Sequence, residues 1–213
     1  GMSAQVGQFF LAAPTFNPNS TLFMVWGGPN DLFLGLALGA DLAVVGEAAV
    51  GNLASIVGGL FVAGAKTVLV PLMPDLALTP LGRSSSPADA AALSLFTAGF
   101  NAGLTAAMAQ IEAQTGINVI LADTTAYLSQ VLANPGFYGF TNTTEQCIES
   151  VQALLTNCQG YLFTDEIHPT TLGHRVLAAS FIGLVPEPGT AWLLLPLAAG
   201  ALAARRRGVS RQC

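Results

Sequence analysis

The chain has 213 residues, enough for one α/β domain with a sizeable core, and its composition of 52% hydrophobic and 9% charged residues excludes a disordered protein. The formal net charge of -5 conceals an uneven distribution, because residues 1–185 carry three basic side chains against eleven acidic ones. Such a body has no basic patch to neutralise phosphate groups, which argues against nucleic-acid binding.

The first third of the chain predicts a strand–helix–strand unit behind a short N-terminal helix. The run TLFMVW is apolar and ends at Gly-Gly-Pro, which indicates a buried strand. An Ala/Val/Leu-rich stretch with several glycines follows and predicts a helix packed closely against a neighbour. We expect a helix over 3–12, a strand over 21–26, a helix over 40–64 and a strand over 66–73.

The segment GRSSSP at 82–87 predicts a flexible loop before the longest helical stretch. Beyond it, strands continue to alternate with helices, a pattern typical of a parallel sheet covered on both faces. We therefore predict a three-layer α/β/α sandwich with a mostly parallel sheet. Its remaining elements are expected over 88–114 (helix), 117–123 (strand), 124–133 (helix), 161–165 (extended) and 170–182 (helix).

Polar residues follow each of the predicted strands. Reactive residues of a parallel sheet lie on the loops after the carboxyl ends of its strands. The placement therefore makes candidates of Asn30, Asp31, Asp75, Asp123, Asp165 and His168.

The segment TDEIHPT puts Asp165 three residues before His168. A nucleophilic serine needs a base to take its proton, and the base needs a carboxylate that fixes its tautomer. Both side chains could converge from one turn to supply this pair. The alternative is that Asp165 caps the following helix while His168 packs or is solvated.

A second candidate is the turn Gly28-Pro29-Asn30-Asp31, directly after the first predicted strand. An amide donor at Asn30 would suit a developing oxyanion, a contribution of roughly 3–4 kcal/mol. The alternative is a tight turn in which Asn30 tolerates a positive φ and Asp31 caps a helix.

Cys147 and Cys158 lie in a Thr/Asn/Gln-rich stretch without the spacing of a zinc site. We expect a disulfide between them, which would require an oxidising compartment. Two small buried thiols are the alternative.

The composition of the sequence changes at residue 186. We therefore expect a domain over 1–185 and a separate tail over 186–213. Pro186-Glu187-Pro188, the uncharged run 189–204 and an arginine cluster follow in that order, and this order resembles a PEP-CTERM sorting signal. The run predicts a C-terminal apolar helix of roughly 24 Å, slightly short of a bilayer core of about 30 Å. The resemblance implies export to the cell envelope of a Gram-negative bacterium, processing by an exosortase at 186–188 and transient membrane contact through 189–204.

The body resembles the SGNH (GDSL-type) esterase/lipase family through its Gly-x-Asn-Asp and Asp-x-x-His motifs. The resemblance implies an SGNH-hydrolase-like fold and hydrolysis of a small ester, a lipid or an acylated carbohydrate, without metal or organic cofactor. It implies His168 as general base, Asp165 as its orienting partner, Asn30 as an oxyanion donor, and Gly28 as part of the same motif.

The family's Gly-Asp-Ser-Leu block, which ends its first strand and carries the nucleophile, does not occur in these residues. No convincing substitute is found, since the serines considered each fit an ordinary polar role: Ser3, Ser20, Ser84–Ser86, Ser129 and Ser180. We expect a truncated form whose first strand and nucleophile lie outside this chain, because an export tail calls for an export signal that the first residues do not show. The alternative is an inactive exported envelope or matrix protein that uses the fold for binding.

Overall fold

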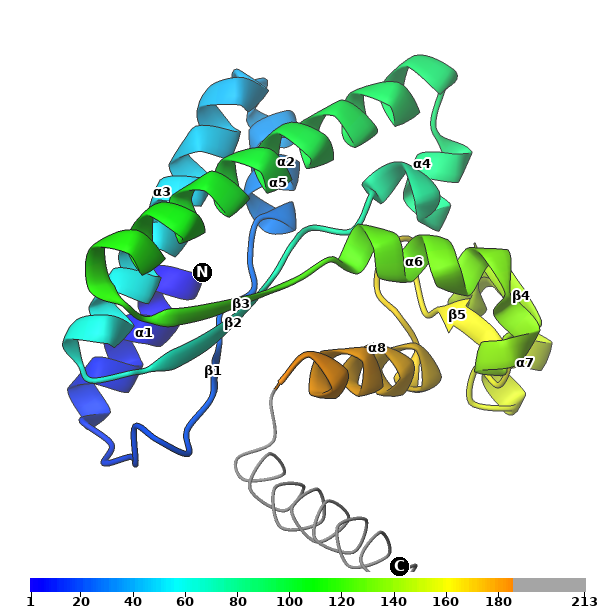
Figure 1. The fold of residues 1–213 in the computed structure, drawn as a ribbon. Coiled ribbons are helices and arrows are strands. Elements are labelled where there is room, and N and C mark those ends of the chain that lie inside the picture. The colour runs from blue at the N-terminus through cyan, green and yellow to red at the C-terminus, as the bar shows by residue number, and fades with distance from the viewer. Residues whose placement is uncertain (186–213) are drawn as a thin grey trace, which may run out of the picture.

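The computed structural model describes residues 1–185, which form an α/β fold around a parallel sheet. Strands β1 (Phe23–Met24), β2 (Thr67–Pro71) and β3 (Asn118–Ala122) are hydrogen-bonded in that order. Every pair is parallel, with Met24 beside Leu69 and Val68 beside Val119. β1 is therefore an edge strand of this sheet, whereas β2 has a neighbour on each side (Figure 1).

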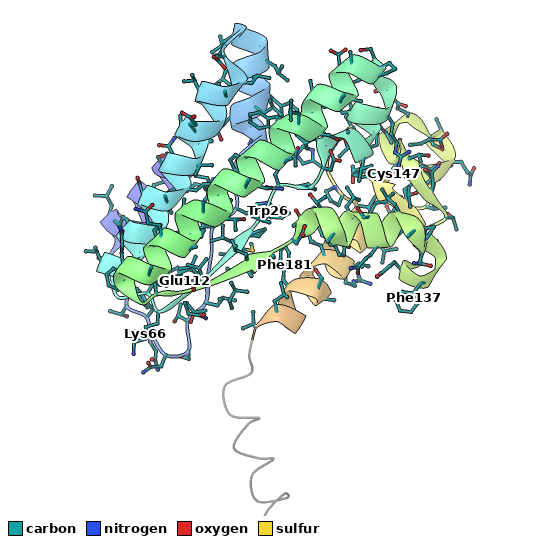
Figure 2. The ribbon with its side chains drawn as sticks, turned by 45° about the horizontal axis from the view of Figure 1, so that its top comes forward. Trp26, Lys66, Glu112, Phe137, Cys147 and Phe181 are labelled. Carbon is teal, nitrogen blue, oxygen red and sulfur yellow. A yellow bond between two sulfur atoms is a disulfide. The ribbon has the colours of Figure 1, made fainter. Side chains whose placement is uncertain are left out.

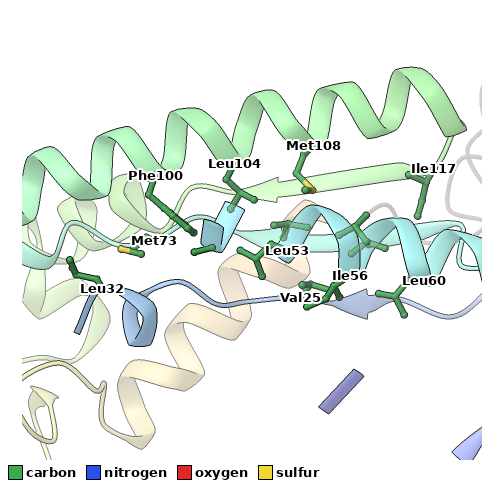
Figure 3. Close-up of a cluster of buried hydrophobic side chains, with 14 of the residues drawn as sticks. Val25, Leu32, Leu53, Ile56, Leu60, Met73, Phe100, Leu104, Met108 and Ile117 are labelled. Carbon is green, nitrogen blue, oxygen red and sulfur yellow. The ribbon is translucent and has the colours of Figure 1, made fainter. Parts of the chain in front are cut away.

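Two long helices cover one face of the sheet. α3 (Leu42–Val62) and α5 (Pro87–Thr115) lie side by side, with α1 (Met2–Ala12) and α2 (Pro29–Leu38) next to α3 (Figure 1). Their inward side chains meet the strands in one apolar core (Figure 3), whose fully or nearly buried members include Leu53, Ile56, Val57, Leu60, Val68, Val70, Phe100, Leu104 and Met108.

The other face of the sheet is covered by α8 (Thr171–Leu184). Leu177 and Phe181 of this helix line a depression together with Leu69 of β2. Phe181 also packs edge-on against Trp26 with ring centroids 5.9 Å apart (Figure 2). Helices on both faces of a parallel sheet give the predicted three-layer α/β/α arrangement.

A smaller group of elements lies beyond the carboxyl ends of β2 and β3 (Figure 1). β5 (Tyr161–Phe163) pairs in parallel with β4 (Asn142–Gln146), and these two strands form a separate sheet. The remaining elements here are the short helices η1 (Leu76–Leu78), α4 (Pro80–Ser84), η2 (Pro135–Tyr138), η3 (Cys147–Glu149) and α7 (Val151–Leu155), and the longer helix α6 (Thr124–Ala133).

The predicted disulfide is present. Cys147 and Cys158 are bonded with their Cα atoms 5.5 Å apart. Cys147 is fully buried, and the bond ties η3 to the turn after α7. It closes the loop that carries the chain from β4 to β5.

Most predicted elements are confirmed within one to three residues. The helix expected over 124–133 has those bounds in α6, and the helices expected over 40–64 and 88–114 are α3 and α5. The strands expected over 66–73 and 117–123 are β2 and β3. Long apolar runs bounded by glycine or proline were therefore reliable signals.

Two local predictions were wrong. The strand expected over 21–26 pairs only at Phe23–Met24, with one further bond from the amide of Val25 to the carbonyl of Leu69. It is not buried throughout, since Met24 at the edge of the sheet is 56% exposed. The flexible loop expected over 82–87 is instead largely helical, because Thr79 caps α4 through the amide of Gly82 and Ser86 caps α5.

The predicted C-terminal apolar helix and sorting segment, residues 186–213, lie outside the described part of the chain. The predicted boundary falls just after α8 ends at Leu184.

Candidate active site

The loop from β5 to α8 is held at both ends by the backbone. The amide of Thr164 donates to the carbonyl of His168 at 2.7 Å, and the amide of Thr170 donates to Leu162 at 2.8 Å. Pro169 forms an isolated antiparallel bridge with Phe163. Thr170 also caps α8, since its hydroxyl accepts from the amide of Gly173. Asp165 and His168 are therefore carried by a fixed loop.

Asp165 organises the inside of this loop. Its Oδ1 accepts from the amides of Ile167 (2.9 Å) and His168 (2.7 Å), and its Oδ2 lies 2.8 Å from Nδ1 of His168. Partial burial acts to raise the pKa of this carboxyl, but the hydrogen bonds from the two amides and the imidazole, with the charge of His168, outweigh it and lower the pKa. Asp165 is thus an anion fitted to hold the histidine ring.

The ring of His168 is oriented but accessible. Its Nδ1 faces the carboxylate, and its side chain is 67% exposed. When Nδ1 carries the proton donated to Asp165, Nε2 presents a lone pair that accepts no hydrogen bond from the described residues 1–185. An imidazole held in this tautomer can act as a general base. The predicted convergence of the two side chains is present in the structure.

A cavity of about 360 Å³ adjoins His168. This volume is within the range of small-molecule sites. Its walls are mostly apolar and come from the end of β1, α6, β5 and the start of α8. The lining residues include Trp26, Leu76, Leu128, Leu162, Phe163, Ile167 and Leu177, together with Gly28, Asn30 and Tyr127.

Asn30 lines the same cavity as His168, on the first turn of α2. Its side chain is exposed, and none of the hydrogen bonds among residues 1–185 uses its amide. The helix begins at Pro29, whose fixed φ favours the first helical position. The motif is therefore a helix start, a short helix that was not predicted. Asn30 and Asp31 occupy its first turn, and the positive φ belongs to Gly28.

Gly28 is required at its position for two reasons. Its φ of 122° belongs to the region that residues with a Cβ rarely adopt. A Cβ built there would lie 2.6 Å from the ring of Phe100 and 2.8 Å from Met73. Glycine lets the backbone turn sharply at the cavity wall and places Asn30 beside it.

The other polar residues after the strands serve the fold. Asp75 caps η1 through the amide of Ala77 and accepts from the hydroxyl of Ser94 at 2.8 Å. Asp123 caps α6 through the amide of Ala126. Neither carboxylate lines the cavity beside His168, nor does Asp31. The structure therefore brings together Gly28, Asn30 and His168 with its partner Asp165.

No serine of the described residues 1–185 lines this cavity. Several serine hydroxyls donate to backbone carbonyls, as Ser129 does to Thr125 and Ser180 does to Leu177. Ser84 and Ser85 donate in the same way to Leu81. Within the part of the chain that the structure describes, no group of three or more His, Cys, Asp or Glu side chains is arranged to hold a metal ion.

The cavity residues that were not predicted as site residues include Trp26, Tyr127 and His174. Trp26 ends the first apolar run, Tyr127 lies on α6, and His174 is one of only two histidines in the chain. The composition alone could have drawn attention to His174. Tyr127 lies within a predicted helix, and nothing in the sequence distinguishes it from the other residues of that helix.

Comparison with known proteins identifies relatives over nearly all of the described residues. The model of the GDSL-like lipase/acylhydrolase family matches residues 2–181. Esterase EstA of Pseudomonas aeruginosa is 32% identical over 201 residues, which cover 88% of this chain and 30% of that protein. An uncharacterized protein from the trpE-trpG intergenic region of Pseudomonas putida is 29% identical over 210 residues, 92% of this chain and 34% of that protein.

A thermolabile hemolysin of Vibrio parahaemolyticus is 26% identical over 200 residues, 85% of this chain and 46% of the hemolysin. The chain thus spans about a third to a half of the length of these relatives.

Proposed function

Because this chain belongs to the GDSL-like lipase/acylhydrolase family, we propose that it is part of a serine-type hydrolase of carboxylic esters, with Asp165 and His168 as its acid–base pair. The observation that carries the proposal is the short contact between the Asp165 carboxylate and Nδ1 of His168, beside an apolar cavity. An esterase from Pseudomonas aeruginosa among the relatives supports the same chemistry.

The reaction would proceed in two halves. Nε2 of His168 removes the proton of a serine hydroxyl, whose oxygen bonds to the ester carbonyl carbon. Asn30 donates to the resulting oxyanion, and the fixed carboxylate of Asp165 stabilises the imidazolium. His168 then returns the proton to the alcohol oxygen as the carbon–oxygen bond breaks. Water, deprotonated by the same histidine, attacks the acyl carbon; the bond from that carbon to the serine oxygen then breaks, His168 returns the proton to the serine oxygen, and the acid is released.

We propose that the nucleophile is a serine outside these 213 residues. The support is twofold: the chain has no Gly-Asp-Ser-Leu segment, and no serine of residues 1–185 lines the cavity. Gly28 acts by shaping the wall that carries Asn30. The proposed chemistry uses no metal or organic cofactor.

Residues 186–213 are proposed as a PEP-CTERM sorting segment following an SGNH-like domain of residues 1–185. The order Pro186-Glu187-Pro188, uncharged run 189–204 and arginine cluster carries this proposal. Such a segment would target the protein to the cell envelope, where an exosortase would process it at 186–188. The disulfide between Cys147 and Cys158 is compatible with such a compartment.

The proposal is tested on the natural protein that contains these residues. It should hydrolyse p-nitrophenyl butyrate, react with a fluorophosphonate probe, and carry the adduct on a serine outside the 213 residues when its peptides are mapped. The His168→Ala variant should lose labelling while keeping its thermal unfolding midpoint. A folded natural protein that neither hydrolyses the ester nor reacts with the probe would instead be a binding protein built on this fold.

A further inference from the structure

The disulfide between Cys147 and Cys158 joins contacts made at the two ends of β5. At the start of this strand, the carbonyl of Cys158 accepts a hydrogen bond from the amide of Tyr161 at 3.0 Å. Just past its end, the carbonyl of Thr164 accepts from the amide of Ile148, the residue after Cys147, also at 3.0 Å. One covalent bond and two hydrogen bonds therefore close a frame around β5 (Figure 1).

This frame ends on the peptide group that precedes Asp165. The carbonyl held by Ile148 belongs to Thr164, the residue directly before Asp165. A second amide, that of Leu81 in α4, donates at 3.0 Å to the carbonyl of Glu166, the residue directly after Asp165. Asp165 is thus held between two peptide groups, one fixed through η3 and the other through α4. The position of its carboxylate depends on both.

The segment between the two cysteines buries little of itself. Within residues 148–157, all of which the structure describes, Ala153 alone is buried. The turn after α7 also carries two non-glycine residues of positive φ, Asn157 at 52° and Cys158 at 60°. Such a backbone is unfavourable for residues with a Cβ. The disulfide therefore has to keep this turn, and the start of β5 that follows it, in place.

We propose that Cys147 and Cys158 are positioning residues, whose disulfide fixes the peptide before Asp165 and so holds the acid–base pair in working geometry. The effect on turnover rests on the proposed ester hydrolysis. Without the bond the strained turn relaxes, β5 shifts, and the carboxylate is displaced from Nδ1 of His168, which it now meets at 2.8 Å. Because Leu81 still holds the other side of the loop, we expect a graded loss rather than a complete one.

The test compares the natural protein with Cys147→Ala/Cys158→Ala and with the control Leu60→Ala. Truncating a buried leucine destabilises a protein about as much as losing a disulfide does. Leu60 lies away from the site, since its carbonyl accepts from Ala65, two positions before β2 begins, whereas the cavity follows the carboxyl ends of the strands. The constants kcat and KM for p-nitrophenyl butyrate are measured well below the unfolding midpoint of each protein.

The disulfide variant should lose about 10- to 100-fold in kcat, the scale of a displacement of about 1 Å at a catalytic pair. Its KM should change less than about 3-fold, because most of the cavity wall lies on elements other than β5. Leu60→Ala should keep kcat within about 2-fold, since it loses stability without disturbing the loop. The variant Cys147→Val/Cys158→Ala, which refills the buried Cys147 position, replaces the alanine pair if that pair does not fold.

A second measurement does not depend on turnover. Hydrogen exchange of the amides of Ile148, Thr164 and His168 reports on the loop directly, because each is hydrogen-bonded to a residue of 164–168. Exchange of these amides should be faster by about 10-fold or more in the disulfide variant than in Leu60→Ala, while the amides of α6 exchange alike in both.

Equal losses of kcat in the disulfide variant and Leu60→Ala would overturn the positioning role, because general destabilisation would then explain both. Turnover and loop exchange that survive the loss of the disulfide would also reject it, and would leave the proposed hydrolysis intact. A natural protein that does not hydrolyse the ester, but whose loop amides exchange faster without the disulfide, would reject the proposed reaction and support the frame around β5.

Discussion

The carboxylate of Asp165 holds both the ring and the backbone of His168, with Oδ2 2.8 Å from Nδ1 and Oδ1 2.7 Å from the amide nitrogen. One acidic side chain therefore sets the tautomer of the imidazole and the shape of the loop that carries it. The same bonds keep the pKa of Asp165 below its ordinary value, although partial burial opposes them.

The lowered pKa predicts a pH-dependent contribution to stability. A carboxyl whose folded pKa lies below its unfolded pKa stabilises the fold above the unfolded value of about 3.9. That contribution is lost as the pH falls through the folded pKa. The difference in unfolding free energy between the natural protein and Asp165→Asn should therefore shrink below about pH 4, as measured by urea unfolding from pH 7 to pH 2.5. A difference that is constant with pH would contradict the role of the charge.

Gly28 should tolerate a methyl group less well than another glycine of positive φ. In Gly28→Ala the new Cβ would meet Phe100 and Met73, and the backbone would be strained at φ 122°. We expect a loss of about 2–4 kcal/mol, strain and crowding together. Gly39, with φ 63° and open space around it, is the matched control.

Gly39→Ala should cost only about 1–2 kcal/mol. Thermal unfolding of both variants measures the difference, which should be roughly 2–8 °C in the midpoint. Equal midpoints would show that Phe100 and Met73 are packed too loosely around Gly28 to be crowded by the added methyl group.

The disulfide should stabilise the loop between β4 and β5. Cys147 and Cys158 are 11 positions apart in the sequence, and closing a loop of this length contributes about 3 kcal/mol. Replacing both cysteines by alanine should lower the unfolding midpoint by roughly 5–12 °C. Mass spectrometry of the oxidised 213-residue chain should find one alkylatable thiol, Cys213. Three alkylatable thiols in protein made under oxidising conditions would contradict the bond.

Asn30→Ala should lower kcat of the natural protein by about 100- to 1000-fold with little change in KM. The amide is proposed to bind the oxyanion of the transition state more strongly than the ground-state carbonyl. Steady-state kinetics with p-nitrophenyl butyrate measures the two constants, and the unfolding midpoint shows whether the first turn of α2 survives. Near-normal kcat in a folded variant would leave Asn30 as a helix-start residue only.

Much of the fold was predictable because long apolar runs were bounded by strong breakers. α6 begins where Asp123 can cap it, and α5 ends at Gly116, which adopts the left-handed conformation. α2 was not predicted, because Gly27-Gly28-Pro29 indicates a turn and the apolar residues behind it show no helical period. α4 was also missed, although Thr79 followed by Pro80 is a regular helix start.

The candidate site was predictable where its residues belong to short motifs, as Gly28 and Asn30 do in one motif and Asp165 and His168 in another. Asp165 and His168 share one loop, so their spacing implied contact. Tyr127 and Trp26 are about a hundred residues apart in the chain, and only the fold brings them to one cavity. The lack of a hydrogen-bond partner for the buried Tyr127 hydroxyl within residues 1–185 has no counterpart in a sequence pattern.

The central claim is tested most directly by the two histidines, since both line the cavity but, within residues 1–185, only His168 has a carboxylate at its Nδ1. The measurement is kcat/KM for p-nitrophenyl butyrate in the natural protein, in His168→Ala and in His174→Ala, with unfolding midpoints to show that each is folded. We predict a loss of about 1000-fold or more in His168→Ala and a change of less than 10-fold in His174→Ala. Comparable activity in all three folded proteins would contradict the account.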